Sequence, residues 1–152
     1  MRARVAGVAV TAAAMLLVPV AVAATPGTYE GWLYNSKGKR YSGTFTMLTV
    51  RDTPRGQRFR LSTYNMRLTC PWLDRNGRLA RARFRFVHRG LVAGDFIDDT
   101  RSYPKDDPTP THEVRIRGRF VGPRFSGRIR VDPAPGVTGT CTGGARVRVT
   151  RR

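Results

Sequence analysis

The sequence predicts an all-β protein, a single antiparallel meander of about eight or nine strands that forms a small barrel or a two-sheet sandwich. Three observations support this fold class. Apolar and polar residues alternate with a period of two over most of the chain, no stretch has the 3.6-residue period of a helix, and Gly and Pro separate the alternating segments. Because successive side chains of a strand point to opposite faces, each segment has one face available for a core.

The alternating segments give the expected strands. They are 28–34, 41–50, 57–63, 66–70, 80–87, 91–97, 113–121, 124–131 and 145–150. Two stretches, 71–79 and 98–111, interrupt the pattern. The second contains several Asp and Pro residues, which are typical of turns, and we expect it to be a long exposed loop.

A short pattern of apolar, small, Gly, polar and apolar residues occurs at 41–45, 92–96 and 125–129. Matching arms, 31–33 and 118–120, precede two of the copies. We interpret these segments as β-hairpins of one meander. A glycine on the inward face of a strand allows close backbone approach, so its recurrence favours a sheet that coils and closes.

The first residues have the pattern of a secretory signal peptide. The run from Val5 to Ala24 contains no charge and ends in small residues, and Ala21 and Ala23 have the spacing that a signal peptidase recognises. We expect a signal peptide over 1–23 and one β domain over 24–152, secreted or otherwise extracytoplasmic, with no stable membrane span after cleavage. An uncleaved membrane anchor is the alternative, because about 20 apolar residues can cross a bilayer.

The two cysteines, Cys70 and Cys141, are expected to form a disulfide. An exported chain meets oxidising conditions, where an even number of cysteines favours pairing. Closing so long a loop disfavours the unfolded chain by about 4 kcal/mol in the chain-entropy model. Neither cysteine has a histidine beside it, so the pair is a poor metal site, and no cofactor motif occurs.

The chain is strongly basic, with 28 Lys and Arg against 10 Asp and Glu, a net charge of +18. In the predicted strands the arginines alternate with core residues, so one face of the sheet carries many guanidinium groups, which bind phosphate and carboxylate in pairs of hydrogen bonds. Trp32 and Tyr34 share this outward phase and are candidate stacking platforms. The candidate polyanion-binding residues are Arg81, Arg83, Arg85, Arg115, Arg117, Arg119, Arg128, Arg130, Arg146, Arg148 and Trp32, with Arg58 and Arg60 in the same phase.

The expected partners are polyanions, namely cell-wall phosphate polymers, nucleic acid or acidic polysaccharide. The alternative is a solvated exterior whose arginines reflect the base composition of the genome. No recognised nucleic-acid motif decides between these two interpretations.

Catalysis has one candidate set, formed by His112, Glu113 and Arg115, which phosphodiester cleavage could use as acid, base and anion-binding groups. Alternation argues against this set, since His112 and Glu113 point to opposite faces of a strand. The other histidine, His88, lies near a predicted turn, and no common hydrolase or phosphate-loop motif occurs. The Asp-rich stretch could hold Ca²⁺, although a turn-forming loop explains it better.

Short motifs across the chain, at 31–33, 41–43, 118–120, 125–127 and 141–143, resemble those of small exported β-rich proteins of high-GC Gram-positive bacteria, which are largely uncharacterised. The resemblance implies export and a β fold, and it carries no functional residue. We therefore expect a non-catalytic secreted or cell-envelope protein that binds polyanions through its arginines. The alternatives are a small secreted phosphodiester hydrolase and a plain structural or inhibitory module.

Overall fold

The computed structural model describes residues 23–103 and 111–152, which form eight strands and no helix. The all-β prediction is confirmed. The strands are β1 (Gly27–Tyr34), β2 (Phe45–Thr53), β3 (Gly56–Leu73), β4 (Leu79–Leu91), β5 (Phe96–Tyr103), β6 (His112–Val121), β7 (Arg124–Pro133) and β8 (Gly143–Arg151).

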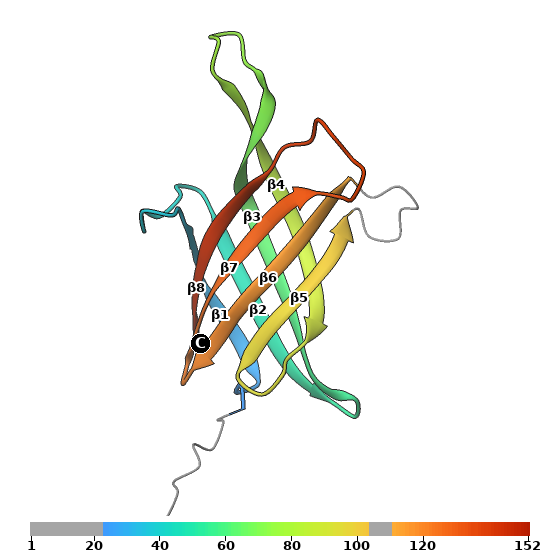
Figure 1. Cartoon of the computed structure of the whole chain (residues 1–152). Helices are drawn as coiled ribbons and strands as arrows, with labels where there is room; N and C mark the ends of the chain where they lie inside the picture. The colour runs from blue at the N-terminus through green and yellow to red at the C-terminus, as the bar shows by residue number, and fades with distance from the viewer. Residues whose placement is uncertain (1–22, 104–110) are drawn as a thin grey trace, which may run out of the picture.

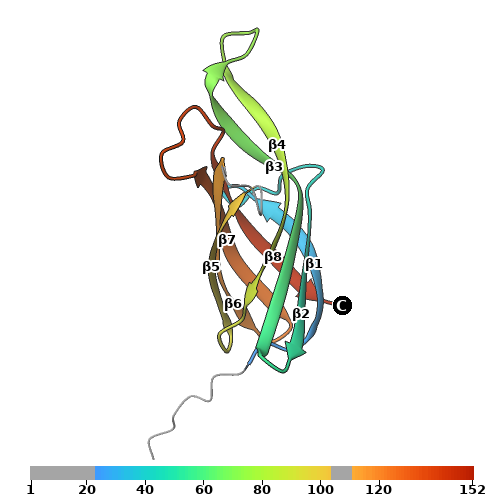
Figure 2. The ribbon, with the colours of Figure 1, turned by 90° about the vertical axis from the view of Figure 1, so that its right-hand side faces the viewer.

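All eight strands belong to one antiparallel sheet of order β4-β3-β2-β1-β8-β7-β6-β5. Two meanders, β1 to β4 and β5 to β8, are joined where β1 pairs with β8. The sheet therefore curves round until its edge strands β4 and β5 face each other, which the two views in Figures 1 and 2 make visible. The outcome is a nearly closed barrel, so of the two predicted forms the sandwich is excluded.

Alternate side chains of the strands fill the barrel interior with apolar groups. Leu48 on β2, Ile116 on β6 and Phe125 on β7 have no exposed surface. The other large residues of this core include Tyr29, Leu33, Val50, Phe59, Leu61, Met66, Leu68, Phe86, Ile97, Phe120, Ile129, Val131, Val147 and Val149. The other alternate residues of each strand face outward, as two-residue periodicity requires.

Inward-facing glycines let the strands of the β6–β7 hairpin approach closely. Gly118 and Gly127 are register partners. A Cβ atom at Gly118 would lie 2.6 Å from the Phe125 Cζ atom and 2.6 Å from the Ser126 carbonyl oxygen. The predicted role of glycine in close backbone approach is therefore confirmed at this hairpin.

The other two copies of the glycine pattern have a different structure. Gly43 and Gly94 lie in turns with φ angles of 69° and 63°, just before β2 begins at Phe45 and β5 at Phe96. The interpretation of all three copies as mid-strand glycines is thus wrong for two of them. Glycine suits both a close approach and a left-handed turn, so the local pattern does not distinguish them.

Several strand boundaries also differ from the prediction. The expected strand 91–97 is not one strand, because β4 ends at Leu91, the chain turns at Gly94, and β5 begins at Phe96. The expected strands 57–63 and 66–70 are one continuous strand, β3, with a bulge between Thr63 and Met66 where Asn65 has a φ of 57°. Residues 98–103, expected to begin a loop, belong to β5, because their acidic side chains find basic partners on neighbouring strands. The rest of that expected loop, with Asp106 and Asp107, lies outside the described residues apart from Thr111.

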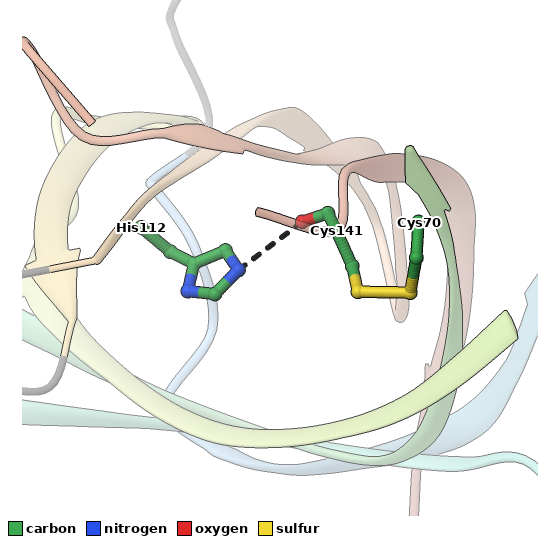
Figure 3. The surroundings of a disulfide bond; sticks show 3 residues. All are labelled: Cys70, His112 and Cys141. Atoms are coloured by element: carbon green, nitrogen blue, oxygen red, sulfur yellow. Dashed lines mark hydrogen bonds between the residues drawn. A yellow bond between two sulfur atoms is a disulfide. The ribbon is translucent and has the colours of Figure 1, made fainter. Parts of the chain in front are cut away.

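The predicted disulfide between Cys70 and Cys141 is present and links two parts of the chain that are not neighbours in the sheet. Cys70 lies on β3 beyond the bulge, and Cys141 lies between β7 and β8 (Figure 3). Beside them, Thr69 and Thr142 exchange two backbone hydrogen bonds of 2.8 Å. These contacts tie the upper part of the β3–β4 hairpin to the opposite meander.

The expected signal peptide, residues 1–23, lies outside the described residues except for Ala23. Ala24, the first residue after the expected cleavage point, is buried, donates a 2.9 Å hydrogen bond to the Gly94 carbonyl and accepts one of 2.7 Å from Gln57. Within the described part of the chain, no helix is long and apolar enough to cross a membrane.

Candidate anion-binding surface

The outward phase of β6, β7 and β8 is occupied mainly by arginines. On β6, Arg115 and Arg117 are exposed on either side of the buried Ile116. Arg128 and Arg130 flank Ile129 on β7 in the same way, and Arg146 and Arg148 flank Val147 on β8. These arginines lie on the outside of the barrel, where strand alternation predicts them.

Strand register places arginines of different strands side by side. Arg146 on β8 is opposite Arg128 on β7, which is opposite Arg117 on β6. Trp32 on β1 is the register partner of Arg148 on β8. Directly opposed residues have Cβ atoms about 4.5–5.5 Å apart, so the outer side of β1, β8, β7 and β6 forms one continuous basic surface.

Carboxylates neutralise the β6 side of this surface. Asp98 on β5 accepts hydrogen bonds from Arg115 Nε and Nη2 at 3.1 and 3.2 Å, and its Oδ2 lies 3.6 Å from Arg117 Nε. Arg119 pairs with Asp95 at 3.2 Å. On β7, Arg130 pairs with Asp132 at 2.8 Å. Asp98, a residue of the Asp-rich stretch considered for Ca²⁺ binding, therefore serves as a counterion of arginines here.

A groove on the outer side of β1, β8 and β7 has a different charge balance. We call it the arginine groove, and it is lined by Arg124, Arg128, Arg146 and Arg148 together with Trp32, Tyr34 and Glu30. Among the described residues, none of these four arginines forms an ion pair with a carboxylate. The only carboxylate in the lining, Glu30, pairs with Arg152 at 2.6 Å.

The aromatic rings of the groove hold guanidinium groups. The Arg148 guanidinium carbon lies 5.1 Å from the centre of the Tyr34 ring, and that of Arg40 lies 4.6 Å from the centre of the Trp32 ring. Trp32 also contacts Phe45 edge to face. The sequence suggested that Trp32 and Tyr34 are stacking platforms. In the structure, one face of each ring contacts an arginine guanidinium, which limits the motion of that arginine.

Comparisons with known proteins find no match. No protein-family model, curated protein or solved structure matched this chain. The function of the groove is therefore argued from its own chemistry.

The remaining candidate arginines lie elsewhere on the barrel. Arg81, Arg83 and Arg85 project from β4, and Arg85 lies over the Tyr64 ring at 4.6 Å. Arg58 and Arg60 line a second hollow over β2, β3 and β4, which also contains Arg51, Arg89 and Arg101. The sequence predicts one arginine face, and because the sheet closes, that face surrounds the molecule and divides into separate regions.

The candidate catalytic set is not assembled. The His112 Nε2 donates to the Cys141 carbonyl at 3.1 Å (Figure 3). The His112 ring lies against Phe84 with ring centres 5.3 Å apart, and its Nδ1 accepts from the Thr111 hydroxyl at 2.9 Å. Glu113 and Arg115 point to the other face of β6, as alternation predicts. Both nitrogens of His112 are thus engaged in structural hydrogen bonds.

His88 has a role that the sequence did not indicate. It lies within β4, fully buried, where a turn was expected nearby, and its Nε2 donates a 2.6 Å hydrogen bond to Asp99 on β5. Asp99 also accepts from Arg101 Nε at 3.0 Å. Tyr103 donates its hydroxyl to the Val87 carbonyl at 2.7 Å.

The His88–Asp99 and Tyr103–Val87 hydrogen bonds bridge β4 and β5, the two edge strands, which do not pair with each other in the sheet. Burial lowers the pKa of His88, and the nearby Asp99 opposes this shift only in part. Burial also raises the pKa of Tyr103 to about 12, which keeps its hydroxyl protonated and able to donate. No local sequence pattern marks the His88–Asp99 pair, because it forms between strands that approach only when the sheet curves.

In the two described ranges, no group of three or more His, Cys, Asp and Glu could hold a metal ion.

Proposed function

We propose that this protein is an exported, non-catalytic binding protein of the cell surface or its surroundings, and that the arginine groove binds polyanions. The observation that carries the proposal is the charge balance of the groove. Four arginines line it without a carboxylate partner among the described residues, while their neighbours on β6 and β7 are paired with Asp95, Asp98 and Asp132.

The chemistry of the groove suits a repeating anionic polymer. Guanidinium groups bind phosphate, sulfate and carboxylate oxygens through paired hydrogen bonds, and rows of them at strand spacing can contact several such groups at once. The Tyr34 ring restrains Arg148, so less side-chain entropy is lost when that arginine binds an anion. Export is supported by the expected signal peptide and by the Cys70–Cys141 disulfide, a bond that persists in oxidising compartments. Membership in the exported actinobacterial-type proteins that the sequence resembles remains part of this proposal.

The experiment compares two double variants with the same net charge. Arg128→Gln/Arg146→Gln removes two groove arginines, while Arg115→Gln/Arg117→Gln removes two arginines of the adjacent strand that pair with Asp98. Binding of heparin and of duplex DNA is measured over a range of NaCl concentrations. For the wild type we expect log affinity to fall linearly with log salt, since binding releases counterions.

On duplex DNA, the groove variant should reduce that salt slope by roughly two, about one for each lost phosphate contact. The paired-arginine control should change it much less. A wild-type affinity that does not depend on salt, or equal effects of the two variants, would contradict the proposal. The first result would favour a structural or inhibitory module.

A further inference from the structure

The β3–β4 hairpin extends beyond the end of the barrel, as both views show (Figures 1 and 2). Its outermost part, residues 71–79, is called the hairpin tip below. Among the described residues, six large hydrophobic side chains are exposed, and three of them lie on this tip. Trp72 exposes 51% of its surface, Leu73 63% and Leu79 54%.

The hairpin tip has an ordered backbone that keeps these apolar side chains in solvent. Leu73 and Leu79 are direct register partners, so their side chains lie on the same side of the two-stranded ribbon. In the turn between them, Asp74 Oδ1 accepts hydrogen bonds from the backbone N–H groups of Asn76 and Arg78 at 2.9 and 3.0 Å. Gly77 supplies the left-handed position with a φ of 70°.

The base of the tip is also held in place. Cys70, immediately before the tip, is bonded to Cys141, and Thr69 pairs with Thr142. The apolar residues thus remain exposed although the hairpin is cross-linked to the barrel. Although the buried Cys70 immediately precedes the tip, Trp72, Leu73 and Leu79 stay exposed, so folding of this chain does not bury them.

The charge around the tip is positive. Residues 71–83 contain four arginines and one aspartate, a net charge of +3, and all four arginines are exposed. Trp and Leu surrounded by arginines form the combination that binds the interface of an anionic bilayer, where the indole lies at headgroup depth and the guanidinium groups contact lipid phosphates. The tip is nine residues long, fewer than the roughly 20–30 residues that each partner contributes to a standard protein interface.

We propose that the hairpin tip docks on the surface of an anionic lipid bilayer by inserting Trp72, Leu73 and Leu79 into its headgroup region. This site is separate from the arginine groove, which lies on β1, β8 and β7. It also lies at the end of the barrel opposite the start of β1 (Figure 1), so the tip can reach a membrane without involving the start of the domain.

The fluorescence of Trp72 provides a direct test. The chain has two tryptophans, so Trp32→Phe leaves Trp72 as the only one. This single-tryptophan protein is titrated with vesicles of equal parts phosphatidylglycerol and phosphatidylcholine, and with vesicles of phosphatidylcholine alone. We expect its emission to shift to shorter wavelength with the anionic vesicles and to shift much less with the neutral ones, because the arginines contribute to binding.

Two further variants in the Trp32→Phe background test whether the hairpin tip is the part of the protein that binds vesicles. Leu73→Ser/Leu79→Ser should weaken vesicle binding by at least about tenfold, since partitioning depends on buried apolar area. The matched control is Leu91→Ser, because Leu91 is equally exposed, at 56%, but lies at the other end of β4. It should bind like the parent protein.

Some results would overturn the proposal. They are an unchanged Trp72 emission at saturating anionic vesicles, an equal effect of Leu91→Ser, or an effect of the tip substitutions only on self-association of the chain. Two further measurements separate this inference from the groove proposal. Heparin binding by Leu73→Ser/Leu79→Ser tests the groove alone. The Trp72 emission shift of Arg128→Gln/Arg146→Gln in the Trp32→Phe background tests the tip alone.

Discussion

Burial of the His88 imidazole couples the stability of the barrel to pH. The ring is stacked on Phe59, with its centre 5.8 Å away, and has no exposed surface. Desolvation lowers its pKa despite the hydrogen bond to Asp99. Below about pH 6.5, the unfolded chain therefore takes up a proton that the folded chain does not. The free energy of unfolding should fall as the pH falls from this value toward the folded pKa.

Replacing His88 by Gln tests this linkage. Glutamine offers an amide N–H to Asp99 but does not titrate, so His88→Gln should lose the part of the acid destabilisation that comes from residue 88. The free energy of unfolding is measured with urea at about pH 7.5 and about pH 5 in both proteins. An equally steep loss of stability in the variant would show that other groups cause it.

The close approach at Gly118 makes a second prediction about a single residue. A Cβ atom there meets a ring carbon and a carbonyl oxygen at 2.6 Å, and neither can move without shifting β7. We expect Gly118→Ala to lower the free energy of unfolding by about 1–3 kcal/mol, the usual cost of overpacking. Gly144→Ala is the matched control, because its nearest contact would be 3.4 Å, and it should change stability by less than about 0.5 kcal/mol. Similar urea midpoints for the two variants would contradict this account.

Among the elements, the disulfide joins β3 to the segment between β7 and β8, which the sheet itself keeps apart. Cys70 and Cys141 are 71 residues apart in sequence. Cys70→Ala/Cys141→Ala should lower the free energy of unfolding by about 4 kcal/mol, since the unfolded chain regains the entropy of the closed loop. Urea unfolding of the wild type with and without a reductant provides the control, because reduction removes the bond without removing the side chains. A loss below about 1 kcal/mol would mean that the unfolded chain is already compact.

The hairpins and turns show which features of the fold the local sequence pattern predicts and which it misses. The β6–β7 hairpin with its turn at Gly122 and Pro123 is located correctly from the sequence, because its pairing partners are adjacent in the chain. The bulge at Asn65 is missed, since the alternation simply restarts one residue later and resembles a gap between strands. Asp98 and Asp99 are misassigned to a loop because their partners, Arg115 and His88, lie on other strands.

For the whole molecule, the high charge should make stability depend on salt. The chain carries a net charge of +18, and the closed sheet distributes its arginines around the barrel at short distances from one another. Their mutual repulsion destabilises the folded state and is screened at higher ionic strength. We expect the thermal midpoint to rise by a few degrees between about 10 mM and about 300 mM NaCl. The rise should be smaller for Arg128→Gln/Arg146→Gln, and a midpoint that is constant or falls with salt would contradict this prediction.

The strand content and the side of each strand that faces the core can be derived from local rules alone, namely two-residue alternation and turn residues. The disulfide follows from an even number of cysteines in an exported chain. The same rules placed the arginines outside and put His112 and Glu113 on opposite faces of β6. Apart from the disulfide, these properties depend only on residues close to one another in the chain.

The curvature of the sheet into a barrel, and the choice of outward arginines that meet carboxylates, became visible in the folded chain. The arginine groove depends on the pairing of β1 with β8, which are distant in sequence, and the His88–Asp99 contact forms only where the edge strands β4 and β5 meet. Register is a property of the whole sheet, set when every strand buries its apolar face at the same time. The surface that this register creates is therefore visible only after the barrel has formed.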